Sequence, residues 1–315
     1  MSPASTAPTA SVFVISDFAV GEESAWDDIR AALRALAHQD FAEPAEYFLL
    51  ERASVAERIP EDLPKILPGL RIVLSQETSS YALKNETAEH ASADLVAILD
   101  ADCIPDSDWL RRLVAALRAD PQAAVVSTKT EYRGRTLLER ILSLLSRAFV
   151  DPGKAGETRF LTNNSAIFRR ADMLRNPLPT AYGPFAARIQ MESFRRAGRA
   201  MLFEPRTRVI HAFHGWPMER DIRRNFGYGA VLIRLADRRL PFAWLTRIGL
   251  ASIPLFVLFR TADSWWNCVR VGPRYGVAWY QVPLALGVAV LVHLLEVPGM
   301  LRAFRGAGAP GSSFR

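Results

Sequence analysis

Cysteine and lysine are scarce in this sequence. The two cysteines, Cys103 and Cys268, are too few and too far apart to form a disulfide framework or a zinc site, which fits a reducing compartment. Lysine occurs only at positions 65, 84, 129 and 154, so nearly all cations are arginines. Basic residues outnumber acidic ones by 39 to 33, and the excess lies in the C-terminal half. A basic surface of this kind suits phosphates or acidic lipid head groups.

The N-terminus lacks both the basic and the apolar region of a signal peptide, and we expect residues 1–10 to form a disordered leader. The C-terminal part has long apolar runs instead. Residues 276–295 carry no formal charge and are long enough to span a bilayer, whereas the run 248–259 is shorter and flanked by arginines. We therefore expect a membrane-associated helical segment over 236–303 and a tail over 304–315. Core helices of a soluble domain are the alternative.

Between the ends, apolar runs alternate with helical periodicity. Strands are predicted at 11–16, 45–51, 71–75, 95–99 and 123–132, and two shorter ones at 200–205 and 208–213. Apolar residues at helical spacing lie between them, as at 23–40 and 106–120. Continuous apolar strands separated by helices indicate a parallel sheet covered on both faces. The sequence thus predicts an α/β, doubly wound, mostly parallel sheet.

Two carboxylates follow the buried run 95–99. Asp100 and Asp102 would lie at the carboxyl end of a parallel strand, where ligands bind in open sheets. Side chains two residues apart in extended backbone point to the same side, so both carboxylates can face one ligand. A divalent cation holding a diphosphate is the ligand that suits them. For an isolated Asp-x-Asp, an acidic loop with one Asp capping the next helix is the better interpretation.

The motif is not isolated. Residues 83–117 carry Lys84-Asn85 at a helix and Asp100-Ala-Asp102 after the next strand. This stretch resembles the nucleotide-sugar segment of family 2 glycosyltransferases of the GT-A type, in which a basic residue and Asn open a helix and a strand delivers the Asp-x-Asp.

Later segments extend the resemblance. Residues 160–174 resemble the acceptor-side segment of that family, and 197–211 resemble its late strand pair, which ends in a histidine. Residues 223–229 resemble the basic, glycine-containing stretch that follows the catalytic domain in membrane-attached members. The resemblance spans roughly residues 11–235, so we expect a GT-A-like nucleotide-sugar and acceptor domain there.

The resemblance implies an inverting, metal-dependent glycosyltransferase. It would move a sugar from a nucleoside diphosphate sugar to a hydroxyl of a lipid-linked or polysaccharide acceptor. Asp102 would hold a Mg²⁺ or Mn²⁺ ion, which would neutralise the leaving diphosphate, and Asp100 would hold the ribose or nucleotide side. His211 resembles the histidine that completes the metal site in some relatives; a structural role at a strand end is equally open.

The remaining expected binding residues occupy positions that match those of binding residues in the family. Lys84, with Asn85 beside it, is placed to reach a phosphate, or is a solvated helix residue. Glu51 ends the second strand where the family usually has an Asp on the nucleotide base, but the usual Asp-Gly-Ser pattern is lacking. Asn163 and Asn164 line the acceptor side in this interpretation, or bridge two loops.

An acid is lacking where the resemblance requires one. Inverting transfer needs a general base near the acceptor hydroxyl, and the family supplies it from an acidic pair at a helix start. Here Ala186 and Ala187 occupy those positions, and Glu192 is the only acid of that helix. The base is therefore Glu192 in a shifted register, or another carboxylate such as Asp172 or Glu157. Otherwise the chain is a non-catalytic nucleotide-sugar-binding or assembly partner in a membrane polysaccharide system.

The partners expected from these observations are a sugar donor, a lipid-linked or glycan acceptor and a membrane. The arginine-rich stretch 218–239 fits an amphipathic helix on an anionic leaflet, or a solvated basic face. Nucleic acid is not expected, since aromatic residues are not interleaved with the cations and no binding module is present. We expect the protein in the cell membrane, with the catalytic domain on the cytoplasmic side.

Overall fold

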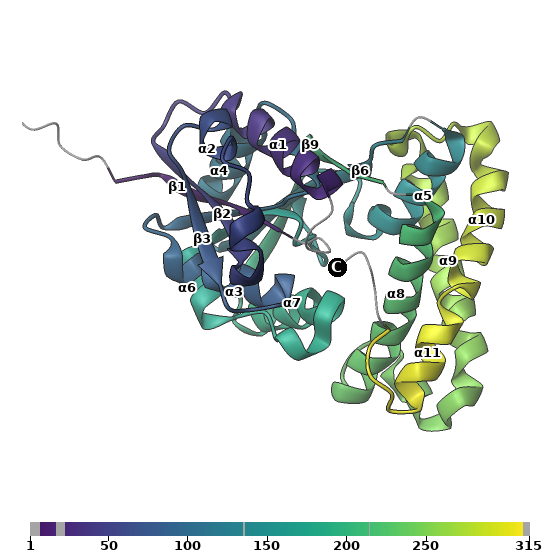
Figure 1. The fold of residues 1–315 in the computed structure, drawn as a ribbon. Helices are drawn as coiled ribbons and strands as arrows, with labels where there is room; N and C mark the ends of the chain where they lie inside the picture. The colour runs from purple at the N-terminus through teal and green to yellow at the C-terminus, as the bar shows by residue number, and fades with distance from the viewer. Residues whose placement is uncertain (1–6, 17–22, 135, 214, 311–315) are drawn as a thin grey trace, which may run out of the picture.

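The structure is a computed structural model that describes residues 7–16, 23–134, 136–213 and 215–310. It contains an α/β domain and a helical bundle that lie side by side (Figure 1). Most of the predicted leader 1–10 and the end of the predicted tail 304–315 lie outside the described residues.

One sheet of nine strands forms the centre of the α/β domain within the described part of the chain. Its order is β3-β2-β1-β4-β8-β6-β9-β5, with β7 beside β9. The bounds are β1 Ala10–Ile15, β2 Ala45–Arg52, β3 Leu70–Ser75, β4 Leu95–Asp100, β5 Cys103–Pro105, β6 Ala123–Tyr132, β7 Gly156–Glu157, β8 Ser165–Arg169 and β9 Ala200–His211. Strands β1, β2, β3, β4, β6 and β9 run in one direction and β5, β7 and β8 run against them, which confirms a mostly parallel sheet.

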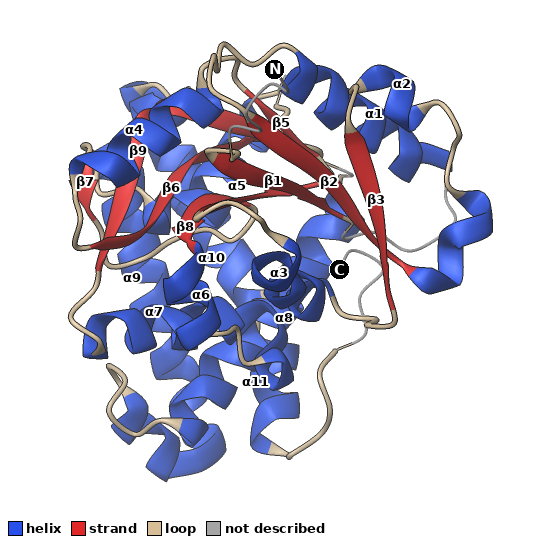
Figure 2. Cartoon of the chain, turned by 90° about the vertical axis from the view of Figure 1, so that its left-hand side faces the viewer, coloured by secondary structure: helices blue, strands red, loops and turns tan. Residues whose placement is uncertain are grey.

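Helices cover both faces of this sheet (Figure 2). On one face lie α1 (Glu23–Ala37), α2 (Leu63–Ile66) and α4 (Trp109–Ala119), and on the other α3 (Ser80–His90), α6 (Arg170–Arg175) and α7 (Ala186–Arg196). Strand β1 shows why both faces must be covered: Val12 and Val14 join the first core, and Phe13 and Ile15 the second. The doubly wound α/β architecture is thereby confirmed.

Strand β9 differs from the prediction of two short strands. It is continuous from Ala200 to His211, because β6 is long enough to pair with both halves. The register shifts between Thr128 and Lys129, and this irregularity accommodates Pro205, which lacks an amide proton for a regular ladder. The continuous strand carries His211 to the end of the sheet, where β5 pairs with it.

The helical bundle consists of α5 (Leu137–Arg147), α8 (Trp216–Ala236), α9 (Ile253–Val271), α10 (Val282–Leu294) and α11 (Val297–Phe304). Helices α5 and α8 fall inside the predicted domain 11–235 yet pack against the later helices. Helices α8 and α11 approach closely at two glycines. A Cβ atom on Gly227 would lie 2.0 Å from the carbonyl oxygen of Glu296, and one on Gly299 would lie 1.9 Å from that of Arg224.

Two helical stretches of the described residues are long and apolar enough to cross a membrane, by length and composition: Ala243–Tyr275 and Trp279–Phe304. Only 33% and 39% of their most apolar windows are buried inside the protein, so much of their apolar surface faces outward. The large exposed apolar side chains include Trp244, Leu258, Trp266, Trp279, Tyr280, Leu284 and Leu294.

Short 3-10 segments complete the chain. They are η1 Ala53–Arg58, η2 Ala148–Val150, η3 Thr180–Phe185, η4 Ala243–Ser252, η5 Gly272–Tyr275 and η6 Trp279–Gln281. Segment η3 joins the two parts of the molecule, because Phe185 packs on Gly229 of α8 so closely that a Cβ atom there would lie 1.7 Å from the ring.

Candidate active site

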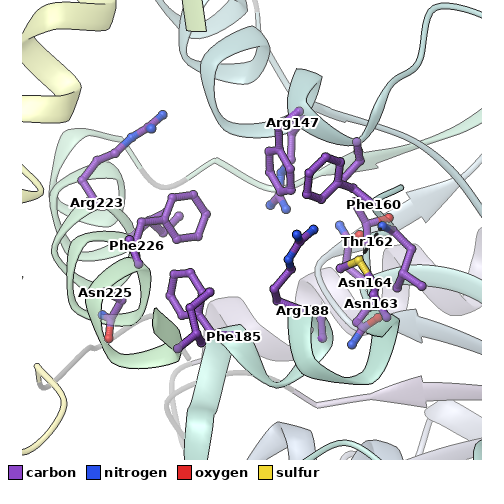
Figure 3. Close-up of a pocket in the computed structure, with 18 of the residues that line it drawn as sticks. Arg147, Phe160, Thr162, Asn163, Asn164, Phe185, Arg188, Arg223, Asn225 and Phe226 are labelled. Atoms are coloured by element: carbon purple, nitrogen blue, oxygen red, sulfur yellow. Dashed lines mark hydrogen bonds between the residues drawn. The ribbon is translucent and has the colours of Figure 1, made fainter. Parts of the chain in front are cut away.

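A cavity of about 1150 Å³ lies between the α/β domain and the helical bundle. It is lined by the carboxyl end of β4, the segment before β8 and the first turns of α7, and on the other side by α5, α8 and α9. Figure 3 shows Thr162, Asn163 and Asn164 on one side of it and Asn225 and Phe226 of α8 on the other.

Asp102 and His211 meet at one end of this cavity. Strand β5 pairs Cys103 with His211, and this register brings His211 Nε2 to 3.0 Å from Asp102 Oδ2. His211 Nδ1 lies 2.6 Å from the carbonyl oxygen of Ala212 and donates to it. Nε2 is therefore the nitrogen that shares a proton or a metal ion with Asp102. The structure thus brings together the two residues predicted as metal ligands.

Lys84 and Asp100 form a buried ion pair beside them. Lys84 Nζ lies 2.7 Å from Asp100 Oδ1, and the two residues are 3% and 5% exposed. Burial raises the pKa of Asp100, Lys84 opposes this, and the neighbouring Asp102 adds to it. The ammonium predicted to reach a phosphate therefore also holds the first carboxylate of the motif in place.

The pKa of Asp102 is shifted in the opposite direction to that of Asp100. Burial alone would raise its pKa, but the charges of His211 and Arg147 and the hydrogen bond from His211 together lower it. Arg147 ends α5 and projects into the cavity (Figure 3). No local sequence pattern selects Arg147, because its position depends on how the bundle packs on the sheet.

Cys103 is a second residue that sequence reasoning missed. Its Sγ donates to Asp102 Oδ1 at 3.4 Å, and the possible ligand atoms of Asp102, Cys103 and His211 lie within 4.8 Å of one another. Burial and the two carboxylates raise the pKa of the Cys103 thiol well above its ordinary value, which disfavours its thiolate while no ion is bound. The carboxylate of Asp102 and the imidazole of His211 form a donor set that would suit Mn²⁺ better than Mg²⁺, which prefers oxygen alone.

The two asparagines have different surroundings. Asn164 accepts a hydrogen bond from Thr130 Oγ1 at 3.3 Å, and its carbonyl oxygen accepts one from the amide of Asp100 at 2.9 Å. It therefore fixes the end of β4. Asn163 is 9% exposed and lines the cavity, and neither atom of its side-chain amide has a hydrogen-bond partner among the described residues. An amide in that state is available to a ligand.

Glu51 and Asn85 do not line the cavity. Glu51 is 2% exposed at the end of β2, accepts a hydrogen bond from the amide of Arg52 at 2.8 Å, and has a pKa raised by burial. Asn85 forms two hydrogen bonds with the backbone of Leu178, of 2.9 and 2.8 Å, which tie α3 to the segment before η3. Their roles in nucleotide binding stay predictions.

Glu192 does not line the cavity, whereas Ala187, Arg188 and Met191 of the same helix do. Arg188 lies 3.3 Å from one of its oxygens and Arg195 lies 2.6 Å from the other. Its role as general base therefore stays a prediction that requires these ion pairs to open.

Other acids differ in how they relate to the cavity. Glu157 lines it, whereas Asp172 pairs with Arg199 at 2.7 Å and does not. Asp151, which sequence reasoning missed, also lines the cavity; it is 1% exposed, and its Oδ2 has no hydrogen-bond partner among the described residues. Glu157 and Asp151 are thus placed at the cavity in addition to the acids of the Asp-x-Asp motif.

Comparison with known proteins agrees with this geometry. Residues 20–190 match the model of glycosyl transferase family 2. The chain is similar to the mannosyltransferase PcManGT of Pyrobaculum calidifontis, solved with GDP-Man and Mn²⁺, with a TM-score of 0.56 and 18% identity over 95% of this chain and 88% of that one. It is also similar to TarS 1–349 of S. aureus, with a TM-score of 0.51 and 13% identity over 95% and 90%. No curated protein matches the sequence.

The family match spans more than half of the chain and therefore shows its family. The chain belongs to glycosyl transferase family 2, is a glycosyltransferase and has a GT-A-like fold.

Proposed function

We propose that this member of glycosyl transferase family 2 transfers a sugar, with inversion, from a nucleoside diphosphate sugar to a hydroxyl of a lipid-linked or polysaccharide acceptor. The observation that carries the proposal is the pairing of Asp102 with His211 at 3.0 Å, at the carboxyl end of the sheet and open to the cavity. Sites for ligands in open α/β sheets lie at that edge.

The donor diphosphate would be held at this end by the metal site and by cations. Asp102 and His211 would hold Mn²⁺ or Mg²⁺. The bound ion would neutralise the charge that develops on the leaving diphosphate. Arg147 adds a fixed positive charge in the cavity, and Lys84 orients Asp100 toward the ribose or nucleotide side. These residues bind and orient the donor whichever nucleotide it carries.

The acceptor hydroxyl must lose a proton as the new glycosidic bond forms, and a carboxylate is the group suited to take it. Glu192 is the candidate from sequence, with Arg188 and Arg195 as the partners it would have to leave. Asp151 and Glu157 are the alternatives, because both line the cavity. Asn163 would orient the acceptor through its unpaired amide.

We place the protein at the cell membrane, with its α/β domain on the cytoplasmic side and the stretches Ala243–Tyr275 and Trp279–Phe304 in or against the bilayer. Exposed tryptophans on these stretches, such as Trp244 and Trp279, suit the head-group level.

Hydrolysis of a panel of nucleotide sugars by the detergent-solubilised full chain tests the proposed function. We expect Mn²⁺-dependent release of nucleoside diphosphate from one donor, abolished by EDTA and reduced at least about 100-fold in Asp102→Ala, since the metal site stabilises the leaving group. His90→Gln, an exposed change outside the cavity, is the control. A donor that binds with metal but is neither hydrolysed nor transferred would favour the non-catalytic alternative.

The same assay, run with an identified acceptor, assigns the base. Among Glu192→Gln, Glu157→Gln and Asp151→Asn, the variant that loses transfer while keeping donor binding removes the base. Equal transfer in all three would contradict a carboxylate base at these positions.

A further inference from the structure

Three arginines from different helices line the cavity: Arg188 of α7, Arg234 of α8 and Arg260 of α9. Arg188 pairs with Glu192 and Arg260 with Glu296. Arg234 instead donates to two backbone carbonyl oxygens, those of Pro241 at 2.8 Å and Ala230 at 2.7 Å. No carboxylate of the described residues lies within ion-pair distance of Arg234.

In this arginine cluster (Arg188, Arg234 and Arg260), Arg188 and Arg260 have carboxylate partners, whereas Arg234 has none among the described residues. Burial, together with the like charges of Arg260 and Arg188, lowers the pKa of Arg234 to about 10. Arg234 is therefore still charged at neutral pH, although its surroundings disfavour the charge. Asp263, an acid of α9 that lines the cavity, is hydrogen-bonded to Asn267. Arg234 is half-buried, and a partly desolvated cation without a counter-charge carries a cost that an anionic ligand offsets.

Aromatic side chains surround the same part of the cavity. The guanidinium of Arg234 lies 5.6 Å from the ring centre of Phe256. Phe242 and Phe259 stack with ring centres 4.7 Å apart and are 42% and 38% exposed, and both line the cavity. An uncompensated positive charge beside exposed aromatic rings matches a ligand that has an anionic head and an apolar chain.

This part of the cavity differs from the donor end. The donor end has its own cations, Lys84 and Arg147, near Asp100 and Asp102. Figure 3 shows Arg188 between Asn163 and Asn164 on one side and Phe185 and Phe226 on the other. Arg188 therefore adjoins the donor end, whereas Arg234 and Arg260 belong to α8 and α9 of the helical bundle.

We propose that Arg188, Arg234 and Arg260 form a subsite for a phosphate group attached to an apolar chain, and that the chain lies against Phe242, Phe256 and Phe259. The acceptor is then an amphiphilic phosphate. Its role as acceptor in the reaction rests on the proposed function, whereas its binding to this subsite does not. The unbalanced charge of Arg234 supplies the affinity for the phosphate, and the aromatic rings supply the preference for a hydrocarbon chain.

Calorimetric titration of the full chain in detergent tests this subsite. The probes are geranyl phosphate, the uncharged geraniol, inorganic phosphate, and a nucleoside diphosphate with Mn²⁺. We expect geranyl phosphate to bind at least about tenfold more tightly than geraniol, and Arg234→Gln to remove most of that difference, since a charge-assisted hydrogen bond is lost. Arg234→Lys should retain part of it.

Arg220→Gln is the matched control, since Arg220 is an exposed arginine of the same helix and does not line the cavity. Its affinity for geranyl phosphate should stay within about twofold of the wild type. Unchanged geraniol binding in Arg234→Gln shows that the cavity is intact; if that variant does not fold, Arg188→Gln replaces it.

Three results would overturn the proposal. Geraniol binding as tightly as its phosphate would mean that the surface is merely apolar. Inorganic phosphate binding as tightly as geranyl phosphate would mean that no chain is recognised. If Arg234→Gln lowered the affinity for the nucleoside diphosphate more than the affinity for geranyl phosphate, the cluster would be assigned to donor binding. None of these readouts depends on turnover, so failure of the proposed function would show separately in the hydrolysis assay.

Discussion

At the scale of single residues, the contact between Asp102 and His211 joins two segments that are far apart in the chain. Each side chain is almost fully buried, and the imidazole is oriented by its bond to the carbonyl oxygen of Ala212. Such a bond to the other ring nitrogen is the usual way in which proteins orient a metal-binding histidine. If the pair holds a metal ion, as we propose, its imidazole is already oriented before any donor binds.

His211→Gln should therefore weaken Mn²⁺ binding. We expect a loss of at least about tenfold in affinity, because one ligand of the pair is replaced by a weaker one. Electron paramagnetic resonance of free Mn²⁺ in titrations of the protein measures it without any substrate. His90→Gln should bind as the wild type does, since His90 is exposed and lies outside the cavity. Equal affinity in both variants would remove His211 from the metal site.

The residues of the site were predictable to different degrees. Asp100 and Asp102 were predictable from a local pattern, because Asp100 ends β4, Asp102 follows two residues later, and strand ends gather at one edge of the sheet. His211, the last residue of β9, was predicted only from the family resemblance. Arg147 and Arg234 reach the cavity only through packing of the bundle, which no local pattern specifies.

At the scale of elements, β1, β2, β3, β4 and β6 were predictable because apolar runs of the right length mark them. The short strands β5 and β7 have no such run and were not predicted. The single strand β9 was not, since Pro205 divides the sequence pattern while the long partner β6 keeps both halves paired. The crossing of α8 and α11 was not predictable either. It depends on Gly227 and Gly299, and sequence alone does not distinguish a packing glycine from a tolerated one.

Gly227→Ala and Gly299→Ala should each destabilise the protein by roughly 1–3 kcal/mol, because the added methyl group meets backbone atoms that have little room to move. Gly287→Ala is the matched control, since a Cβ atom at Gly287 of α10 meets nothing within 4 Å. That control should be neutral or stabilising by up to about 1 kcal/mol. Thermal unfolding in detergent compares the three, and a stable Gly227→Ala variant would contradict the close helix crossing.

At the scale of the whole molecule, the predicted domain 11–235 and the later helices share a core. Ile141 and Leu144 of α5 belong to one hydrophobic cluster with Val282 and Ala289 of α10. Arg270 and Arg274 of the later segment bind Asp151, through its carbonyl oxygen at 2.6 Å and its carboxylate at 3.1 Å. The two parts therefore stabilise each other.

A chain ending at residue 236 should consequently fail to give a soluble monomer, since it would expose the apolar faces of α5 and α8. Size-exclusion chromatography and circular dichroism of this fragment, beside the full chain in the same detergent, provide the measurement. A folded, monomeric fragment with intact Mn²⁺ binding would instead establish residues 11–235 as an independent domain.

The position of the cavity between the α/β domain and the apolar helices has a kinetic consequence for the proposed reaction. A water-soluble donor and an amphiphilic acceptor would reach it from different phases. The rate would then follow the bulk concentration of the donor but the mole fraction of the acceptor in the micelle or bilayer. Adding inert detergent at constant acceptor would slow the reaction by surface dilution, although neither substrate had become scarcer in the tube.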